Sequence, residues 1–191
     1  MKKIVILSGS PSASSRLVGA LTFVHQQLVV QGHAVEWVNI RDLPPEDLIY
    51  AQFNSPHIQD VHQAIALADG VIVASPVYKA SYTGLLKSYL DLLPTDAFSG
   101  KVVFPLMIGG TPAHLLALEY ALKPLCAVLG SRNVLQGVYV LESEVVRADD
   151  GEFQLDSQIK QRLAQNAIAF GEELFHIQSQ PLSQKAVRQS V

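Results

Sequence analysis

Three segments of the chain carry residues that can bind an anion and a flat ring. The first, residues 8–16, contains five serines, a glycine and an arginine, and it comes directly before an amphipathic stretch. Hydroxyls and free backbone N–H groups at the start of a helix bind anions, and a guanidinium adds a charge with two parallel donors. Ser10, Ser15 and Arg16 are therefore candidate ligands of a phosphate group. A run of serines is also an ordinary helix N-cap, and this segment alone leaves both interpretations open.

The spacing of this first segment excludes the common nucleotide motifs. It lacks the glycines of the dinucleotide fingerprint, and no Gly-Lys-Ser/Thr follows it as in a Walker A loop. The single phosphate of a mononucleotide fits the segment better.

The second and third segments each follow a short apolar run. Residues 76–79 come after the run at 71–74, and a proline there ends an interior strand because it has no N–H. Residues 109–114 come after the run at 102–108, and two glycines allow the backbone to approach a ligand closely. The candidate binding residues are Pro76, Val77, Tyr78 and Lys79 in the second segment and Gly109, Gly110, Thr111 and His114 in the third.

The elements that must position these segments alternate along the chain. Five apolar runs, which are typical of central parallel strands, are interspersed with five helical patterns. The pattern predicts an α/β fold, a flavodoxin-like doubly wound five-stranded parallel sheet of order 2-1-3-4-5. Ligands of such sheets bind where the first and third strands end, so all three segments fall on one edge. The expected strands are residues 3–7, 34–40, 71–74, 102–108 and 133–141.

One helical pattern, residues 112–129, contains an internal proline. Its leucines at 115, 118, 122, 125 and 129 share one face, and Pro124 cannot bond the carbonyl of Tyr120. A proline inside a regular helix costs ~3 kcal/mol. A widened π-type turn around Tyr120 would relieve this cost, and a plain kink or a helix that ends there are the alternatives.

Composition narrows the classes of function. The 191 residues make one domain, which we expect to span residues 1–178, with a polar and disordered tail at 179–191. A net charge of −3 without a basic stripe argues against nucleic acid. The absence of a membrane-spanning run and the single cysteine indicate a cytoplasmic protein that binds no membrane. No metal site is expected, because the histidines near residues 57–62 lack further ligands at suitable spacing.

Taken together, the motifs resemble the NAD(P)H-dependent FMN reductases. They are GSP at residues 9–11 with SR at 15–16, PVYKASYTG at 76–84 and GGTPAHLL at 109–116. The similarity covers roughly residues 3–175 and is greatest to the FMN reductases of two-component alkanesulfonate monooxygenase systems. One departure is Leu17, where that group has a serine, so one phosphate hydroxyl is expected to be missing.

The resemblance implies roles for the candidate residues. Ser10, Ser15 and Arg16 would hold the FMN phosphate, while residues 76–79 and 109–111 would border the isoalloxazine with His114 nearby. Tyr120 matches a tyrosine inserted in a π-type turn, which in those relatives is associated with tetramer packing and with flavin as a substrate. No catalytic side chain is expected, because hydride transfer between two bound rings needs orientation rather than an acid or base.

The function implied is reduction of FMN by NADPH or NADH, with delivery of reduced flavin to a flavin-dependent monooxygenase for alkanesulfonate desulfonation and sulfur acquisition. A homotetramer, as a dimer of dimers, is the expected assembly. One alternative is an enzyme that keeps FMN bound and reduces quinones or azo dyes, and another is a flavodoxin-like electron carrier. The modest charge and the long connection at residues 41–56 argue against a carrier. Neither Arg16 nor Lys79 can be assigned to a 2′-phosphate, so the choice of nucleotide stays open.

Overall fold

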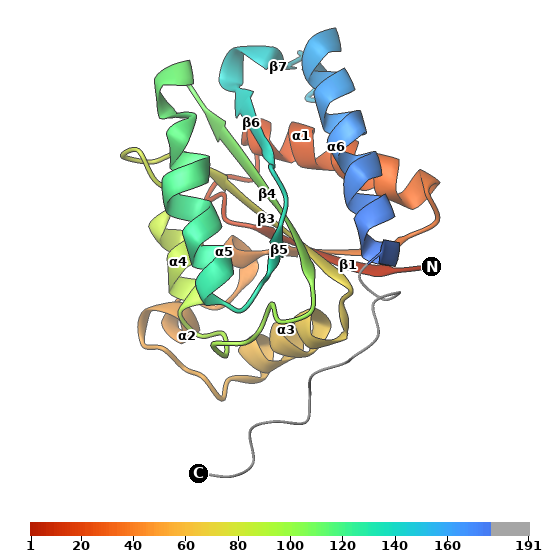
Figure 1. Ribbon diagram of the computed structural model, residues 1–191. Coiled ribbons are helices and arrows are strands. Elements are labelled where there is room, and N and C mark those ends of the chain that lie inside the picture. Colours follow the sequence, from red (N-terminus) through yellow and green to blue (C-terminus); the bar gives the residue numbers. More distant parts are fainter. Residues whose placement is uncertain (177–191) are drawn as a thin grey trace.

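A twisted parallel sheet with helices on both faces forms the centre of the structure, a computed structural model that describes residues 1–176 (Figure 1). The strand order is β2-β1-β3-β4-β5, which confirms the predicted flavodoxin-like topology. The tail expected at residues 179–191 lies outside the described residues. The strands of this sheet are β1 (Lys3–Ser8), β2 (Ala34–Asn39), β3 (Gly70–Pro76), β4 (Val102–Gly109), β5 (Asn133–Val134) and β6 (Val138–Leu141).

The helices divide between the two faces of the sheet. Helices α1 (Arg16–Val30) and α6 (Ser157–His176) pack together on one face, while α3 (Pro56–Leu67), α4 (Gly84–Leu90) and α5 (Lys123–Val128) cover the other (Figure 1). Side chains alternate between the faces along each strand, so Ile4 and Ile6 enter the α1/α6 core while Val5 and Leu7 enter the opposite core. Burial on both faces explains why the strands are continuously apolar. No helix within residues 1–176 is long and apolar enough to cross a bilayer.

The fifth strand was expected to be continuous over residues 133–141, and this was wrong. It is broken into β5 and β6, which both pair with β4, and the outer strand has one residue more than β4 between the paired stretches. The break lies opposite Pro105, which has no N–H to donate. Gly137 turns the chain there with φ +77°, and a Cβ at this position would collide with the Pro105 carbonyl.

Another expected boundary also differs from the structure. Strand β3 runs through Ser75 to Pro76 rather than ending at residue 74. Its pairing with β1 ends at Ala74, and Pro76, which has no N–H, pairs only with β4. The long connection at residues 41–56 contains the end of η1 (Ile40–Asp42) and the whole of α2 (Pro45–Ile49). The polar segment after β6, residues 142–155, forms η4 (Glu142–Glu144) and a hairpin of β7 (Val145–Arg147) with β8 (Phe153–Leu155).

The stretch with the internal proline is not one regular helix. It begins as the 3-10 turn η2 (Pro112–His114), continues through the π-helix η3 (Leu118–Leu122) and ends as α5. The π-helix lies where a widened turn was expected, and the N–H of Lys123 donates to the Leu118 carbonyl. Pro124 thereby falls in the first turn of α5, where its missing N–H costs little. The prediction that Leu115 shares one face with the other leucines was wrong, because Leu115 is exposed.

Candidate functional site

The ends of β1 and β3 are fastened together by a buried threonine. The hydroxyl of Thr83 donates to the Gly9 carbonyl oxygen (2.7 Å) and accepts from the Leu86 N–H (3.1 Å), so it caps α4 as well. The Thr83 N–H donates to Ser75 Oγ (2.9 Å), and the Gly9 N–H donates to the Ala74 carbonyl oxygen (2.8 Å). These bonds hold the serine-rich segment and the segment after β3 in one fixed arrangement.

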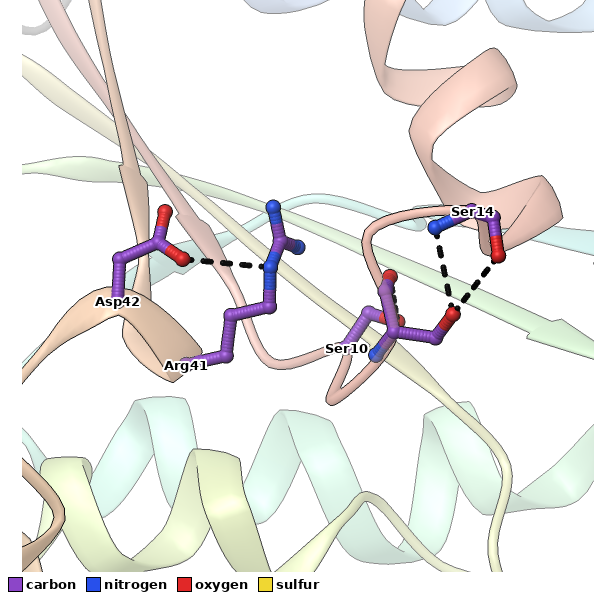
Figure 2. A network of polar contacts seen from close by, with 5 residues as sticks. Ser10, Ser14, Arg41 and Asp42 are labelled. Atoms are coloured by element: carbon purple, nitrogen blue, oxygen red, sulfur yellow. Dashed lines mark hydrogen bonds and ion pairs between the residues drawn. The ribbon is translucent and has the colours of Figure 1, made fainter. Parts of the chain in front are cut away.

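Hydroxyl groups organise the serine-rich segment from within. The Ser10 hydroxyl donates to the Ser12 carbonyl oxygen (3.1 Å), and the hydroxyls of Ser12 and Ser14 lie 3.1 Å apart (Figure 2). Ser15 Oγ accepts from the Leu17 N–H (3.2 Å) and caps α1, whose first turn contains no acidic residue. The capping interpretation is therefore correct for Ser15, and the N-terminus of α1 remains favourable to an anion.

A pocket of ≈ 290 Å³ opens beside this loop at the carboxyl edge of the sheet. Its lining joins the β1–α1 loop and the start of α1, the end of β3, the end of β4, and η4 and β7 after β6. Five of the predicted binding residues meet in it, and five residues that were not predicted join them. The lining residues are Ser10, Ser15, Arg16, Pro76 and Tyr78, with Ser12, Ser14, Ile108, Glu142 and Arg147.

The charged groups of the pocket are two arginines and one glutamate. Arg16 Nη1 lies 3.7 Å from Glu142 Oε2, and both side chains are about half exposed, at 50% and 48%. Arg147 Nε donates to the Gly151 carbonyl oxygen (3.4 Å), and its guanidinium lies 6.0 Å from the centre of the Phe153 ring. The pocket thus offers two guanidinium groups and a set of hydroxyls to an anion, while Glu142 partly neutralises them.

The segment after β3 makes a tight, strained turn. Tyr78 and Ser81 exchange backbone hydrogen bonds of 2.8 and 3.1 Å around Lys79 and Ala80, whose φ values are +50° and +61°. Positive φ at both central residues is typical of a type I′ turn, and it is strained for residues other than glycine. The turn presents Tyr78 and Lys79 to solvent beside the pocket, while Val77 packs against the core.

The segment after β4 is positioned by Tyr139 of β6. The Tyr139 hydroxyl donates to the Thr111 carbonyl oxygen (2.7 Å), and a Cβ on Gly109 would collide with that hydroxyl. Burial, with the charge of Glu142 as a second cause, raises the pKa of Tyr139, so its phenol stays protonated as the donor. Thr111 Oγ1 accepts from the Ala113 N–H (3.3 Å) and starts η2, in which His114 is half-buried.

The arrangement suits a phosphate with a ring beside it. The pocket contains the donor set that a phosphate needs, in two guanidinium groups, serine hydroxyls and the N-terminus of α1. Of the other predicted residues, Val77, Lys79, Gly109, Gly110, Thr111 and His114 do not line the pocket, but they lie on the two segments that follow β3 and β4. The residues present therefore fit a mononucleotide whose phosphate occupies the pocket.

Sequence reasoning missed three charged residues at this edge. Glu142 and Arg147 come from the polar segment after β6, for which no role was predicted, and Arg41 follows β2. Each reaches the site through the packing of distant segments rather than through a local motif. Position in the predicted topology was the one available signal, since Arg41 directly follows the strand next to β1.

A flavodoxin-like sheet with a pocket of serines and arginines where its first and third strands end is typical of the mononucleotide-binding α/β proteins. Within that class, residues 2–145 match the family described as NADPH-dependent FMN reductase, and the chain belongs to this family. The resemblance inferred from the motifs is thus confirmed.

Similar proteins of known function and structure agree with this assignment. The chain is 42% identical over 175 residues to an FMN reductase (NADPH) of Pseudomonas putida, which covers 91% of this chain and 86% of the relative. It is 45% identical over 144 residues to an FMN reductase (NADPH) of Escherichia coli, which covers 75% of each. The apo form of an NADH:FMN oxidoreductase, EmoB, superimposes with a TM-score of 0.81 at 32% identity, covering 95% of this chain and 92% of that one. The protein is therefore an oxidoreductase that reduces FMN with NAD(P)H.

Proposed function

We propose that this reductase releases reduced FMN to a flavin-dependent monooxygenase, of the kind that desulfonates alkanesulfonates for sulfur acquisition. Support comes from the motif resemblance and from the state of the phosphate pocket. Its main cation, Arg16, is half exposed and already paired with Glu142, so a phosphate there gains less than it would from a free, buried guanidinium. A weakly held flavin can enter and leave in each cycle, as a diffusible product must.

In this proposal the side chains of the edge bind and orient. Arg16, Ser10 and Ser15 take the phosphate, and Arg147 adds a second cation. The segments 76–79 and 109–111, with His114 beside them, border the flavin ring. When bound, FMN accepts a hydride from the nicotinamide of NAD(P)H, and the chain supplies position rather than an acid or base.

We also propose that the chain assembles into a homotetramer, as a dimer of dimers. Several of the exposed large apolar side chains fall in two segments of the chain, and exposed apolar surfaces are typical of subunit interfaces. Light scattering at micromolar concentration is expected to give four chains, or two on dilution, and a monomer would contradict this. The exposed side chains are Ile49, Tyr50 and Phe53 in and after α2, and Leu115, Leu116, Tyr120 and Val128 between η2 and α5.

A cytoplasmic location fits the one thiol of the chain. Cys126 is fully buried, and burial raises its pKa to about 12, so it is neither a disulfide former nor a reactive nucleophile.

Anaerobic turnover followed by ultrafiltration tests the proposed release. With NADPH and a tenfold excess of free FMN over protein, we expect many flavins to be reduced per chain and the reduced flavin to pass into the filtrate. Reduced flavin that stays with the protein, together with fast reduction of a quinone or an azo dye, would instead assign a bound prosthetic group. If the protein oxidises neither NADPH nor NADH with any acceptor, the remaining alternative is a flavodoxin-like electron carrier.

A further inference from the structure

A further cationic group lies on the other side of the serine-rich loop. Arg41, in η1 after β2, has a side chain only 20% exposed, and its Nε forms an ion pair of 3.3 Å with Asp42 Oδ1. Figure 2 shows its guanidinium between Asp42 and the loop that carries Ser10 and Ser14. Within residues 1–176, its Nη1 is buried and has no hydrogen-bond partner. A buried donor without a partner is costly, and an anion would satisfy it.

An apolar pocket of ≈ 300 Å³ adjoins this guanidinium. It lies between η1–α2 and the start of α4, and leucines at positions 43, 48 and 85 form much of its wall. Arg41 is the one charged residue among its lining residues, all of which lie in the described part of the chain. An apolar wall with one cation at its side suits a ligand with a flat apolar body and an anionic group.

This pocket is distinct from the one that contains Arg16. The two share no lining residue, so Arg41 serves a different anion from the phosphate next to Arg16. Both open on the carboxyl edge of the sheet, and the apolar pocket includes Gly84 and Leu85, which directly follow the segment 76–83. A molecule whose reacting ring lies at that segment therefore has the apolar pocket close by.

We infer that the apolar pocket binds the adenosine end of NADPH and that Arg41 binds its 2′-phosphate. This inference rests on the proposed function, since it places the nicotinamide against a flavin at residues 76–79. NADPH and NADH differ only in the 2′-phosphate, and an arginine is the residue that accommodates it in other nucleotide-binding sheets. Asp42 fixes the guanidinium through Nε and leaves the terminal nitrogens to form paired bonds with phosphate oxygens.

Substitution of Arg41 tests the assignment through nucleotide selectivity. Arg41→Ala is expected to lower kcat/KM for NADPH about tenfold to a hundredfold, mostly through KM, because a charge-assisted contact is lost. The value for NADH is expected to stay within twofold. Arg41→Lys keeps the positive charge but loses the two parallel donors of the guanidinium, so its kcat/KM for NADPH should lie between those of the parent and Arg41→Ala. Arg132→Ala, an exposed arginine that lines neither pocket, is the matched control and should change neither value.

Binding without turnover supplies an independent readout. Calorimetry should show that adenosine 2′,5′-bisphosphate binds the parent at least tenfold more tightly than adenosine 5′-monophosphate, and that Arg41→Ala removes the difference. Ser88→Trp, which fills the pocket, should weaken both ligands equally. If Ser88→Trp does not fold, the Arg41 comparison still decides the assignment of the 2′-phosphate.

Several results would overturn the inference. One is an equal loss of kcat/KM with NADPH and with NADH in Arg41→Ala. Another is a loss of FMN affinity in that variant, which would assign Arg41 to the flavin phosphate. A third is dissociation of the oligomer, which would assign Arg41 to a subunit contact. A parent that reduces FMN but does not favour NADPH would also contradict it. A parent that reduces FMN with neither nucleotide would instead refute the proposed function.

Discussion

Arg16 and Glu142 form an ion pair of 3.7 Å across the phosphate pocket, between the start of α1 and the turn after β6. A phosphate bound to Arg16 must compete with this carboxylate and also lie close to it. A Cβ on Gly110 would lie 3.8 Å from Glu142 Oε2, so the carboxylate also adjoins the segment that would border the flavin ring. We therefore expect Glu142 to oppose binding of the flavin phosphate, through its charge and its pairing with Arg16.

Replacing Glu142 with glutamine is expected to strengthen FMN binding. An ion pair that is half exposed contributes up to about 1 kcal/mol, and removal of its repulsion toward phosphate adds to this, so the Kd should fall about twofold to tenfold. Fluorescence quenching titrations at low and high salt would measure it, with a larger gain at low salt. Glu152→Gln, which removes the same charge from an exposed position outside the pocket, should have no effect. Weaker binding in Glu142→Gln would show that the carboxylate holds the site together.

The opposite change is expected for Arg16. Arg16→Ala removes a charge-assisted contact to phosphate and should weaken FMN about tenfold to a hundredfold, toward the lower value because the side chain is half exposed. Riboflavin, which lacks the phosphate, should bind the variant and the parent alike in the same titration. An unchanged Kd for FMN would mean that the phosphate lies elsewhere.

Thr83 is expected to stabilise the site through the bonds that join its loops. Thr83→Val keeps the shape but leaves the Gly9 carbonyl and the Leu86 N–H without their partner, which costs about 1–3 kcal/mol of unfolding free energy. Urea denaturation would measure the loss, and FMN affinity should fall with it because the serine-rich loop loosens. The exposed Thr95→Val is the matched control and should remain within about 0.5 kcal/mol of the parent.

The local part of this site could be predicted from the sequence, whereas its long-range part could not. The serines and Arg16 form one continuous segment, and the apolar runs gave the strand order, so these positions followed from pattern. Glu142, Arg147 and Arg41 reach the site only because η4, β7 and η1 fold against it. The break at Gly137 depends on Pro105 in the neighbouring strand, and pairing of this kind leaves no periodic signal within either segment.

Acid is expected to destabilise the protein partly through His62. Burial lowers the pKa of His62, and its Nε2 is buried without a partner among residues 1–176, with the Tyr89 ring 6.0 Å away. The unfolded chain therefore binds the proton more readily, and stability present above pH 6.5 is lost as the pH falls toward the lowered pKa. His62→Gln should make the fall in Tm between pH 7.5 and 5.5 shallower, as measured by calorimetry. His57→Gln, at an exposed ring, should not, and equal slopes in His62→Gln and the parent would contradict the assignment.

The π-helix Leu118–Leu122 sets Tyr120 apart from the regular helix that follows. Tyr120 is 78% exposed in the single chain, although it is a large amphipathic residue that usually finds a partner. Glu119 and Lys123, on either side of Tyr120 in the sequence, form an ion pair of 2.6 Å that spans the widened turn. A widened turn is less stable than a regular helical turn, and contacts with a facing subunit can offset this cost in free energy. We expect the turn to link subunit packing to the affinity for flavin.

Deletion of Tyr120 is expected to remove the extra residue of this turn and to restore a regular helix up to Pro124. The variant should purify with FMN bound and turn over free FMN slowly, while its bound flavin is still reduced by NADPH. Tyr120→Ala separates the two possible causes, because it keeps the inserted residue but removes the ring. If the widened turn controls how tightly FMN is held, Tyr120→Ala should still exchange FMN with solution as the parent does. If the tyrosine ring controls it, Tyr120→Ala should behave like the deletion. Visible absorbance of the purified protein, light scattering and stopped-flow reduction would measure the three properties. A deletion variant that is colourless, assembles as the parent does and reduces free FMN at the parent's rate would leave the turn as a packing feature, made necessary by Pro124 alone.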